Sequence, residues 1–209
     1  MINLLSVILN QNVAIFYMIN NGMDNNIFDI IMPLITNFGS FIAWTIVCAL
    51  LFIFGGNKGK RIAVLGLAAL FISNMAVYLL KYIIAEPRPF LTLTHVDLLV
   101  PENEIYSFPS SHTASSFAVA TIIGLKYRLN LNGRKYSLIY PLIIFAGIIG
   151  FSRIYIGVHY PLDVIFGAII GILSALIILK FEENLFVDKL SHICLLDKLI
   201  DNFKHFNEK

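Results

Sequence analysis

Three ionisable side chains suited to chemistry on an anion lie in one short segment, between uncharged apolar runs over 136–152 and 164–179. They are Arg153, His159 and Asp163. Such groups are costly beside apolar helices in a membrane, and their presence there indicates a functional site. Arginine offers a permanent cation with a planar fork that matches phosphate, and an imidazole oriented by a carboxylate can attack as a nucleophile. These residue types therefore indicate attack on an anion.

The local sequence also predicts how this bend is built. Pro161 suits the first turn of a helix, because its missing N–H is not needed there. Asp163 then lies in the first turn, where the helix dipole favours a carboxylate, and it reaches back toward His159 as in a capping box. That contact would fix the tautomer of the imidazole. For this segment taken alone, an ion pair that only caps a helix is an equal alternative.

A second candidate segment contains Ser110, Ser111 and His112, directly after Pro109. The proline interrupts a loop, and either serine can cap a helix that begins near the histidine. The N-terminus of a helix offers free N–H groups and a positive dipole, which together bind anions. A plain serine cap would explain the serines but needs no imidazole, so His112 favours a functional interpretation.

The composition is that of a membrane protein. The chain has 209 residues, of which 58% are hydrophobic and 13% are charged, and its mean hydropathy is +0.80. An ordinary soluble domain has about 25% charged residues. The net charge of +2 gives no support to nucleic-acid binding. Cys48 and Cys194 indicate neither a disulfide framework nor a metal site.

The apolar runs predict an all-α integral membrane bundle with about five to six transmembrane helices. Residues 1–23 are uncharged but contain Asn10, Gln11 and Asn12, so they form either a first span or an interfacial helix, and a span is favoured. Asn74, inside an apolar run, is interpreted as a hydrogen-bonding residue between helices. The other expected segments are an interfacial helix near 25–38, spans near 40–56, 62–80 and 113–125, and the two runs around His159.

Basic turns orient this bundle. By the positive-inside rule the turns over 56–61 and 126–135 are cytoplasmic, so the loop over 84–111 and the bend over 153–161 lie on the opposite side. This topology gathers ionisable groups at the outer ends of the spans, where they could form a pocket for a multiply charged anion. These groups are Lys81, Arg88, His112, Arg153, His159 and Asp163.

The chain is expected to divide into a membrane-embedded domain over 1–180 and a tail over 181–209. In the tail, apolar residues recur at near-helical spacing between lysines and aspartates. This pattern predicts an amphipathic helix on the cytoplasmic membrane surface. A helix that binds a partner protein is the alternative.

Three motifs together resemble the signature of the type 2 phosphatidic acid phosphatase superfamily. They are Lys81-x6-Arg88-Pro89, Pro109-Ser110-Ser111-His112 and Ser152-Arg153-x5-His159-x3-Asp163. The resemblance covers about residues 25–180. Many members of the family have glycine where Ser111 stands, which puts the substrate preference in question more than the activity.

The resemblance implies a mechanism. His159 is expected to form a phosphohistidine, with Asp163 orienting it and His112 protonating the leaving oxygen, before water releases phosphate. The groups expected to hold the phosphoryl oxygens are Lys81, Arg88, Arg153, Ser110 and the backbone N–H of Ser111. The family needs no metal or other cofactor for this work, and no carboxylate cluster suited to Mg²⁺ accompanies the motifs.

The expected substrate is a membrane lipid that carries a phosphate or diphosphate. The short chain and the outward-facing site resemble prokaryotic undecaprenyl-diphosphate phosphatases, with an active site on the extracytoplasmic side of the plasma membrane. Phosphatidate or phosphatidylglycerophosphate is the alternative substrate. From other classes, an anion or lipid transporter would commonly show an internal repeat, and none is apparent. A non-catalytic lipid-binding relative would be expected to lack one of the histidines or the aspartate.

Overall fold

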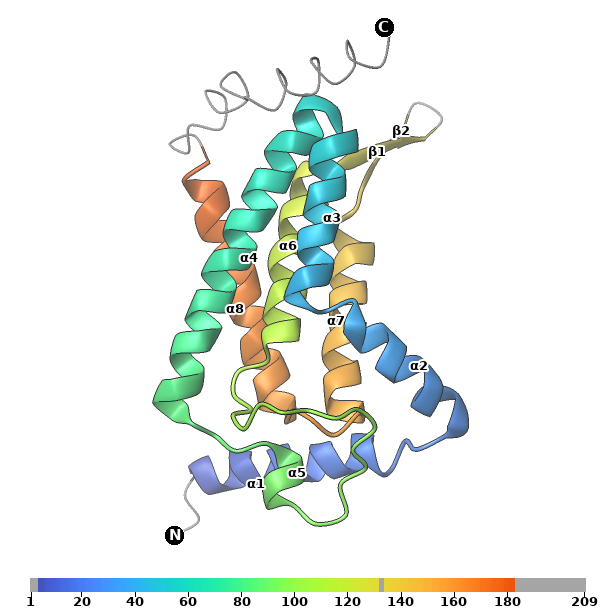
Figure 1. Cartoon of the computed structure of the whole chain (residues 1–209), viewed down its shortest axis with the longest axis vertical. Helices are drawn as coiled ribbons and strands as arrows, with labels where there is room; N and C mark the ends of the chain where they lie inside the picture. Colours follow the sequence, from blue (N-terminus) through green and yellow to red (C-terminus); the bar gives the residue numbers. More distant parts are fainter. Residues whose placement is uncertain (1–3, 132–133, 183–209) are drawn as a thin grey trace, which may run out of the picture.

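Five helices run along the long axis of the computed structural model, which describes residues 4–131 and 134–182 (Figure 1). They are α3 (Phe41–Phe54), α4 (Gly56–Ile84), α6 (Ser111–Lys126), α7 (Ile139–Tyr155) and α8 (Pro161–Lys180). α6 lies in the middle and packs against the other four. The expected helical bundle is therefore confirmed.

α6 is almost entirely enclosed, and small residues make this possible. Its buried positions are mostly alanine, serine, threonine and glycine, which let neighbouring helices approach closely. Gly171 of α8 is one point of closest approach, because a Cβ there would lie 2.4 Å from the carbonyl oxygen of Ala114. Gly167 fills the same role one turn earlier, where a Cβ would lie 2.7 Å from the carbonyl oxygen of Ser110. The start of α8 is thus fixed against the start of α6.

The outer faces of the bundle carry large apolar side chains. Phe54, Phe71 and Leu173 are examples, each with more than half of its surface exposed. Within the described residues, α4 and α8 are long and apolar enough to cross a membrane, and α2 (Asn26–Asn37) and α3, bent by 59° at their junction, pass the same test as a pair. The protein is therefore a mostly helical integral membrane protein. The expected count of five to six spans is not confirmed by length and hydropathy.

The break before α3 was expected from the sequence, and the structure confirms it. The expected segments over 25–38 and 40–56 correspond to α2 and α3. Asn25 caps α2 by accepting hydrogen bonds from the N–H groups of Ile27 and Phe28. Ser40 caps α3 by accepting one from Ala43. Local capping chemistry therefore placed these boundaries.

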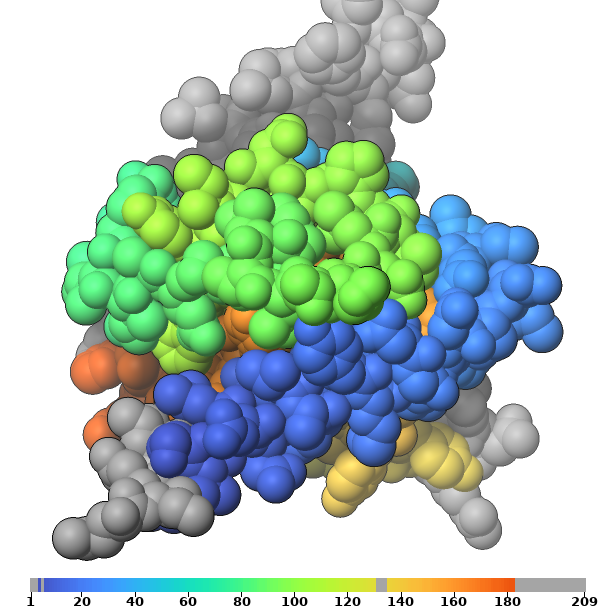
Figure 2. All heavy atoms as spheres, turned by 90° about the horizontal axis from the view of Figure 1, so that it is seen from below, coloured from blue at the N-terminus to red at the C-terminus, as the bar shows by residue number. Residues whose placement is uncertain are grey.

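The preference for a span over residues 1–23 was wrong. α1 (Leu4–Asn20) lies across one end of the bundle, roughly perpendicular to the long helices (Figure 1). Its inner face packs Phe16 and Ile19 against the residues that join α7 to α8. Figure 2 shows this end of the molecule, covered by α1 in blue and by the loop over 85–110 in green. The loop contains one short helix, α5 (Pro89–Thr92).

The opposite end of the bundle contains a small departure from the all-α expectation. β1 (Arg128–Leu131) and β2 (Arg134–Ser137) form an antiparallel pair in which Arg128 lies opposite Ser137. The sequence was interpreted there as a basic turn over 126–135. Its alternation of basic and apolar residues is too short to distinguish a strand from a turn. The amphipathic helix predicted in the tail falls beyond residue 182 and so lies outside the residues that the structure describes.

Candidate active site

The bend between α7 and α8 brings His159 and Asp163 into contact. Pro161 is the first residue of α8, as the sequence predicted. Asp163 Oδ2 accepts a hydrogen bond of 2.8 Å from the backbone N–H of Tyr160, and it lies 3.1 Å from His159 Nδ1. Both His159 and Asp163 are completely buried. The capping contact and the histidine contact therefore occur together on one carboxylate oxygen.

Ser107 joins this pair, and sequence reasoning missed it. Its hydroxyl donates a hydrogen bond to Asp163 Oδ2, and its Oγ lies 3.3 Å from His159 Nδ1. Ser107 is completely buried. Its backbone N–H donates to the carbonyl oxygen of Glu86 at 2.7 Å, which fixes its place in the loop. The only sequence signal is a hydroxyl residue shortly before Pro109, and that signal does not differ from an ordinary loop serine.

The opposite edge of the imidazole faces a guanidinium group. His159 Nε2 lies 3.4 Å from Arg88 Nη1, and the same Nη1 donates to the carbonyl oxygen of Val158 at 3.1 Å. Burial, together with the positive charges of Arg88 and Arg153, lowers the pKa of His159 well below its ordinary value. With Nδ1–H donated to the carboxylate, a neutral imidazole presents the lone pair of Nε2 on the side of the cations. Such an imidazole can act as a nucleophile toward phosphorus.

The three cations expected from the motifs are gathered around this edge of the histidine. The side chains of Arg88, Arg153 and Lys81 are 1%, 4% and 9% exposed. They are linked by two carboxylates of the loop, Glu102 and Glu104, which sequence reasoning did not include in the site. Buried cations near one another repel, so these carboxylates are needed to stabilise the cluster.

Two of these cations have donors without partners. Within the described residues, Arg88 Nε and Arg153 Nε are buried and make no hydrogen bond. The remaining nitrogens of Arg153 donate to Thr36 Oγ1 on α2 and to Glu102 Oε2, both at 3.0 Å. An unpaired buried N–H is unfavourable, so each is a donor available to an anion. Thr36 carries no sequence motif and could not have been identified beforehand.

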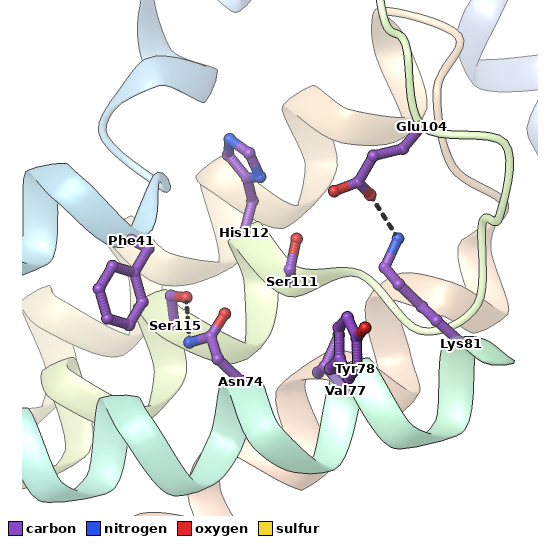
Figure 3. Close-up of a pocket in the computed structure, with 9 residues that line it drawn as sticks. All are labelled: Phe41, Asn74, Val77, Tyr78, Lys81, Glu104, Ser111, His112 and Ser115. Atoms are coloured by element: carbon purple, nitrogen blue, oxygen red, sulfur yellow. Dashed lines mark hydrogen bonds and ion pairs between the residues drawn. The ribbon is translucent and has the colours of Figure 1, made fainter.

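His112 lies in a neighbouring cavity of about 310 Å³, which it shares with Lys81 (Figure 3). The full lining is Phe41, Asn74, Val77, Tyr78, Lys81, Glu104, Ser111, His112 and Ser115. Asn74 donates to Ser115 Oγ at 2.9 Å and so links α4 to α6, which confirms the interpretation of Asn74 as an interhelical hydrogen-bonding residue. The cavity joins polar groups from α4, α6 and the loop beside exposed apolar residues of the bundle.

Ser110 has the geometry of a helix cap. Its Oγ accepts hydrogen bonds from the N–H and the hydroxyl of Thr113, at 3.4 and 3.0 Å. Its own N–H donates to the backbone carbonyl oxygen of Asp163 at 3.1 Å. The side chain of Ser110 therefore caps α6, whereas the side chain of Ser111 faces the cavity (Figure 3). The cap also ties the start of α6 to the first turn of α8.

The site gathers cations and acid–base groups. Within residues 4–131 and 134–182, no group of three or more His, Cys, Asp or Glu side chains is arranged to hold a metal ion. Glu102 and Glu104, the nearest carboxylates to the cations, are already paired with them. The arrangement suits positioning and charge stabilisation of a phosphoryl group.

Comparison with known proteins agrees with this chemistry. Residues 62–186 match the PAP2 superfamily. The chain is 32% identical over 183 residues to the undecaprenyl-diphosphatase BcrC of Bacillus subtilis, covering 84% of this chain and 88% of that protein. It is 30% identical over 175 residues to an undecaprenyl-diphosphatase of Sulfolobus acidocaldarius, covering 83% and 79%.

A solved structure is similar to this chain in both fold and sequence. The crystal structure of Aquifex aeolicus LpxE superposes with a TM-score of 0.68 at 34% identity, and the match covers 81% of this chain and 95% of that one. Family, relatives and fold therefore point to the same chemistry as the buried histidine and its cations. The chain belongs to the PAP2 superfamily, and it is a membrane lipid phosphatase.

Proposed function

We propose that this phosphatase removes the terminal phosphate of a polyprenyl diphosphate, with undecaprenyl diphosphate as the first candidate. The observation that carries the reaction type is the buried His159, held by Asp163 on one side and facing three cations on the other. The substrate class is supported by the relatives named undecaprenyl-diphosphatase. A site that borders apolar helices also suits a substrate that stays in the bilayer.

His159 is the nucleophile in this proposal. Its Nε2 forms a bond to the terminal phosphorus as the bond to the bridging oxygen breaks, and Asp163 stabilises the resulting positive charge on the imidazole. His112 donates a proton to the bridging oxygen, so that the lipid monophosphate leaves. Water then attacks the phosphohistidine, His112 accepts its proton, and inorganic phosphate is released.

The cations stabilise the transferred group. Charge spreads over three equatorial oxygens during phosphoryl transfer, and fixed cations lower the barrier without reorganising. Lys81, Arg88 and Arg153 supply those charges, and the two unpartnered Nε donors add directed hydrogen bonds. Ser110 and the backbone N–H of Ser111, at the N-terminus of α6, complete the oxyanion contacts.

In the same proposal α3, α4, α6, α7 and α8 all cross the plasma membrane, and α1 and α2 lie at the outer interface. α6 carries serine, threonine and histidine, but its neighbours enclose it, so it needs no apolar surface toward lipid. Basic residues lie at the end opposite the site, among them Lys58, Lys60 and Arg61 of α4. By the positive-inside rule that end is cytoplasmic and the active site is extracytoplasmic.

Phosphate release by purified wild type and His159→Ala tests the proposal, in detergent with EDTA, on undecaprenyl diphosphate, phosphatidate and phosphatidylglycerophosphate. We expect release by wild type, fastest from the diphosphate, and loss of activity in the variant. His95→Asn, an exposed histidine on the loop at the same end, is the matched control and should keep full activity.

Two results would contradict the proposal. Activity that survives in His159→Ala would exclude that residue as the nucleophile. Faster release from phosphatidate than from the diphosphate would exclude the polyprenyl substrate while leaving the mechanism intact.

A further inference from the structure

Two carboxylates of the loop form ion pairs with all three cations of the site. Glu104 Oε2 accepts from Lys81 Nζ at 2.7 Å and from Arg88 Nη2 at 3.0 Å, and the contact with Lys81 is visible in Figure 3. Glu102 Oε2 lies 3.0 Å from Arg153 Nη2 and 3.5 Å from Arg88 Nη1. Each carboxylate therefore bridges two cations, as oxygens of a bound phosphate group could.

The cations and the carboxylates differ in their access to water. Lys81, Arg88 and Arg153 are each at least nine-tenths buried, whereas the side chains of Glu102 and Glu104 are 21% and 59% exposed. The carboxylates thus reach the cations from the solvent side. More than half of the surface of the Glu104 side chain is already in contact with solvent.

The backbone is anchored on both sides of these carboxylates, and before them the N–H of Leu99 donates to the carbonyl oxygen of Ile156 at 3.3 Å. The segment just after Glu104 is paired with the segment before Arg88, through a hydrogen bond of 3.1 Å from the N–H of Arg88 to the carbonyl oxygen of Ile105. Glu102 Oε1 accepts from the N–H groups of Asn103 and Glu104, within its own turn. The side chains can therefore leave the cations without breaking that backbone pairing.

We propose that Glu102 and Glu104 are internal anions that occupy the phosphate-binding cations in the free enzyme and compete with both substrate and product for them. This inference rests on the proposed function of the same site. The pair lowers the affinity for every anion by the free energy needed to separate the carboxylates from the cations. A diphosphate lipid overcomes that penalty through its charge and its lipid contacts. Inorganic phosphate lacks the lipid contacts and is expelled.

The competing explanation is that the two carboxylates have a purely structural role. In that case the carboxylates would only hold the loop in place and keep the cations from repelling one another. Neutralising them would then loosen the site, raise KM and weaken phosphate binding. The two explanations predict opposite changes in affinity, so one measurement separates them.

The test uses Glu102→Gln, Glu104→Gln and the double variant, with inorganic phosphate as the probe. Binding is measured by calorimetry on the purified protein in detergent and, separately, as inhibition of phosphate release from undecaprenyl diphosphate. We expect each single variant to bind phosphate about three- to tenfold more tightly, the range spanned by partly shielded ion pairs. KM should fall together with the dissociation constant for phosphate, and kcat should stay the same or decrease because product leaves more slowly.

Asp24→Asn is the matched control, because it removes one negative charge at the same end of the molecule. Asp24 lies between α1 and α2, near Asp29 and Asp97, and none of the described ion pairs joins it to the three cations. Its effect on phosphate affinity should be less than about twofold, the size of a screened surface interaction. An equal gain in phosphate affinity in this control would show that the effect comes from the net charge alone, and it would overturn the proposal.

Unchanged or weaker phosphate binding in Glu104→Gln would also overturn it. Glu104 is the more exposed of the two, so this variant keeps the test available if Glu102→Gln does not fold. The calorimetric result does not depend on turnover. If wild type releases no phosphate from any lipid but the variants bind phosphate more tightly, the proposed function fails and the internal-anion proposal stands.

Discussion

Asn12 on α1 accepts a hydrogen bond of 2.9 Å from the backbone N–H of Leu162, in the first turn of α8. α1 lies across the end of the bundle, so this contact joins it to the turn that carries Asp163. Pro161 has no N–H, and the N–H of Asp163 bonds to the carbonyl oxygen of Tyr160. Asn12 therefore satisfies the one remaining free donor of that turn, in the manner of a helix cap.

Replacing Asn12 with alanine should weaken both stability and turnover. The N–H of Leu162 would lose its partner, which for a lost cap is worth about 1 kcal/mol of folding free energy. We expect kcat to fall several-fold, because Asp163 and His159 lose part of their support, while KM changes less. Asn12→Asp, which keeps an acceptor, should recover most of the activity. Asn10→Ala, at an exposed position of the same helix, is the control and should behave as wild type.

Ser107→Ala should lower kcat about tenfold with little change in KM, because one hydrogen bond to a charged group is worth about 1.5 kcal/mol. The hydroxyl holds the carboxylate of Asp163, so its loss affects the orientation of His159, the proposed nucleophile, rather than substrate binding. Ser107→Thr keeps the hydroxyl and should recover part of the rate. Ser73→Ala removes a buried hydroxyl that donates to the carbonyl oxygen of Leu70, within α4. An equal loss in that control would assign the effect to packing.

The effect of His112→Gln should depend on the leaving group. If His112 protonates the bridging oxygen, its loss slows a lipid substrate by about 10²- to 10⁴-fold, the usual contribution of a general acid. An activated substrate such as p-nitrophenyl phosphate needs no proton on its leaving oxygen and should be slowed far less. Rates on both substrates, measured side by side, give the comparison. Equal slowing of the two would assign His112 to phosphate binding instead.

The imidazole of His159 should remain neutral at pH 6. Burial, followed by the charges of Arg88 and Arg153, lowers its pKa well below 6.5, and only protonation below that pKa removes the free lone pair. Nitrogen-15 spectra of the histidine side chains, assigned against His159→Gln, should show an Nδ1–H tautomer that does not titrate between about pH 5.5 and 8. An ordinary midpoint near 6.5 would contradict this environment.

Gly171→Ala should destabilise the bundle, whereas Gly147→Ala should not. A Cβ at position 171 would lie 2.4 Å from the carbonyl oxygen of Ala114, so α8 would have to move away from α6. Overpacking of this kind costs about 1–3 kcal/mol. A Cβ at position 147, in the middle of α7, meets nothing within 4 Å, and alanine there should be neutral or stabilise by up to about 1 kcal/mol. Thermal unfolding in detergent measures both.

The sequence alone was sufficient for features that depend on neighbouring residues. Pro161 and Asp163 predicted the start of α8 and the carboxylate contact with His159, because both act within one turn of helix. The expected change from a segment near 25–38 to one near 40–56 likewise corresponds to the break between α2 and α3. The motifs then identified the family through residue types at fixed spacing. The catalytic and phosphate-binding roles of those residues stay predictions.

Only the tertiary structure decided which distant residues complete the site. Ser107, Thr36 and Asn12 reach Asp163, Arg153 and the start of α8 across at least 56 positions of sequence, and each is an ordinary polar residue in its own segment. Glu102 and Glu104 look like solvated loop carboxylates until folding places them on the cations. Whether α1 spans or covers the bundle depended on where Phe16 and Ile19 find apolar partners. Hydropathy and capping act locally, whereas these contacts exist only once the helices have packed.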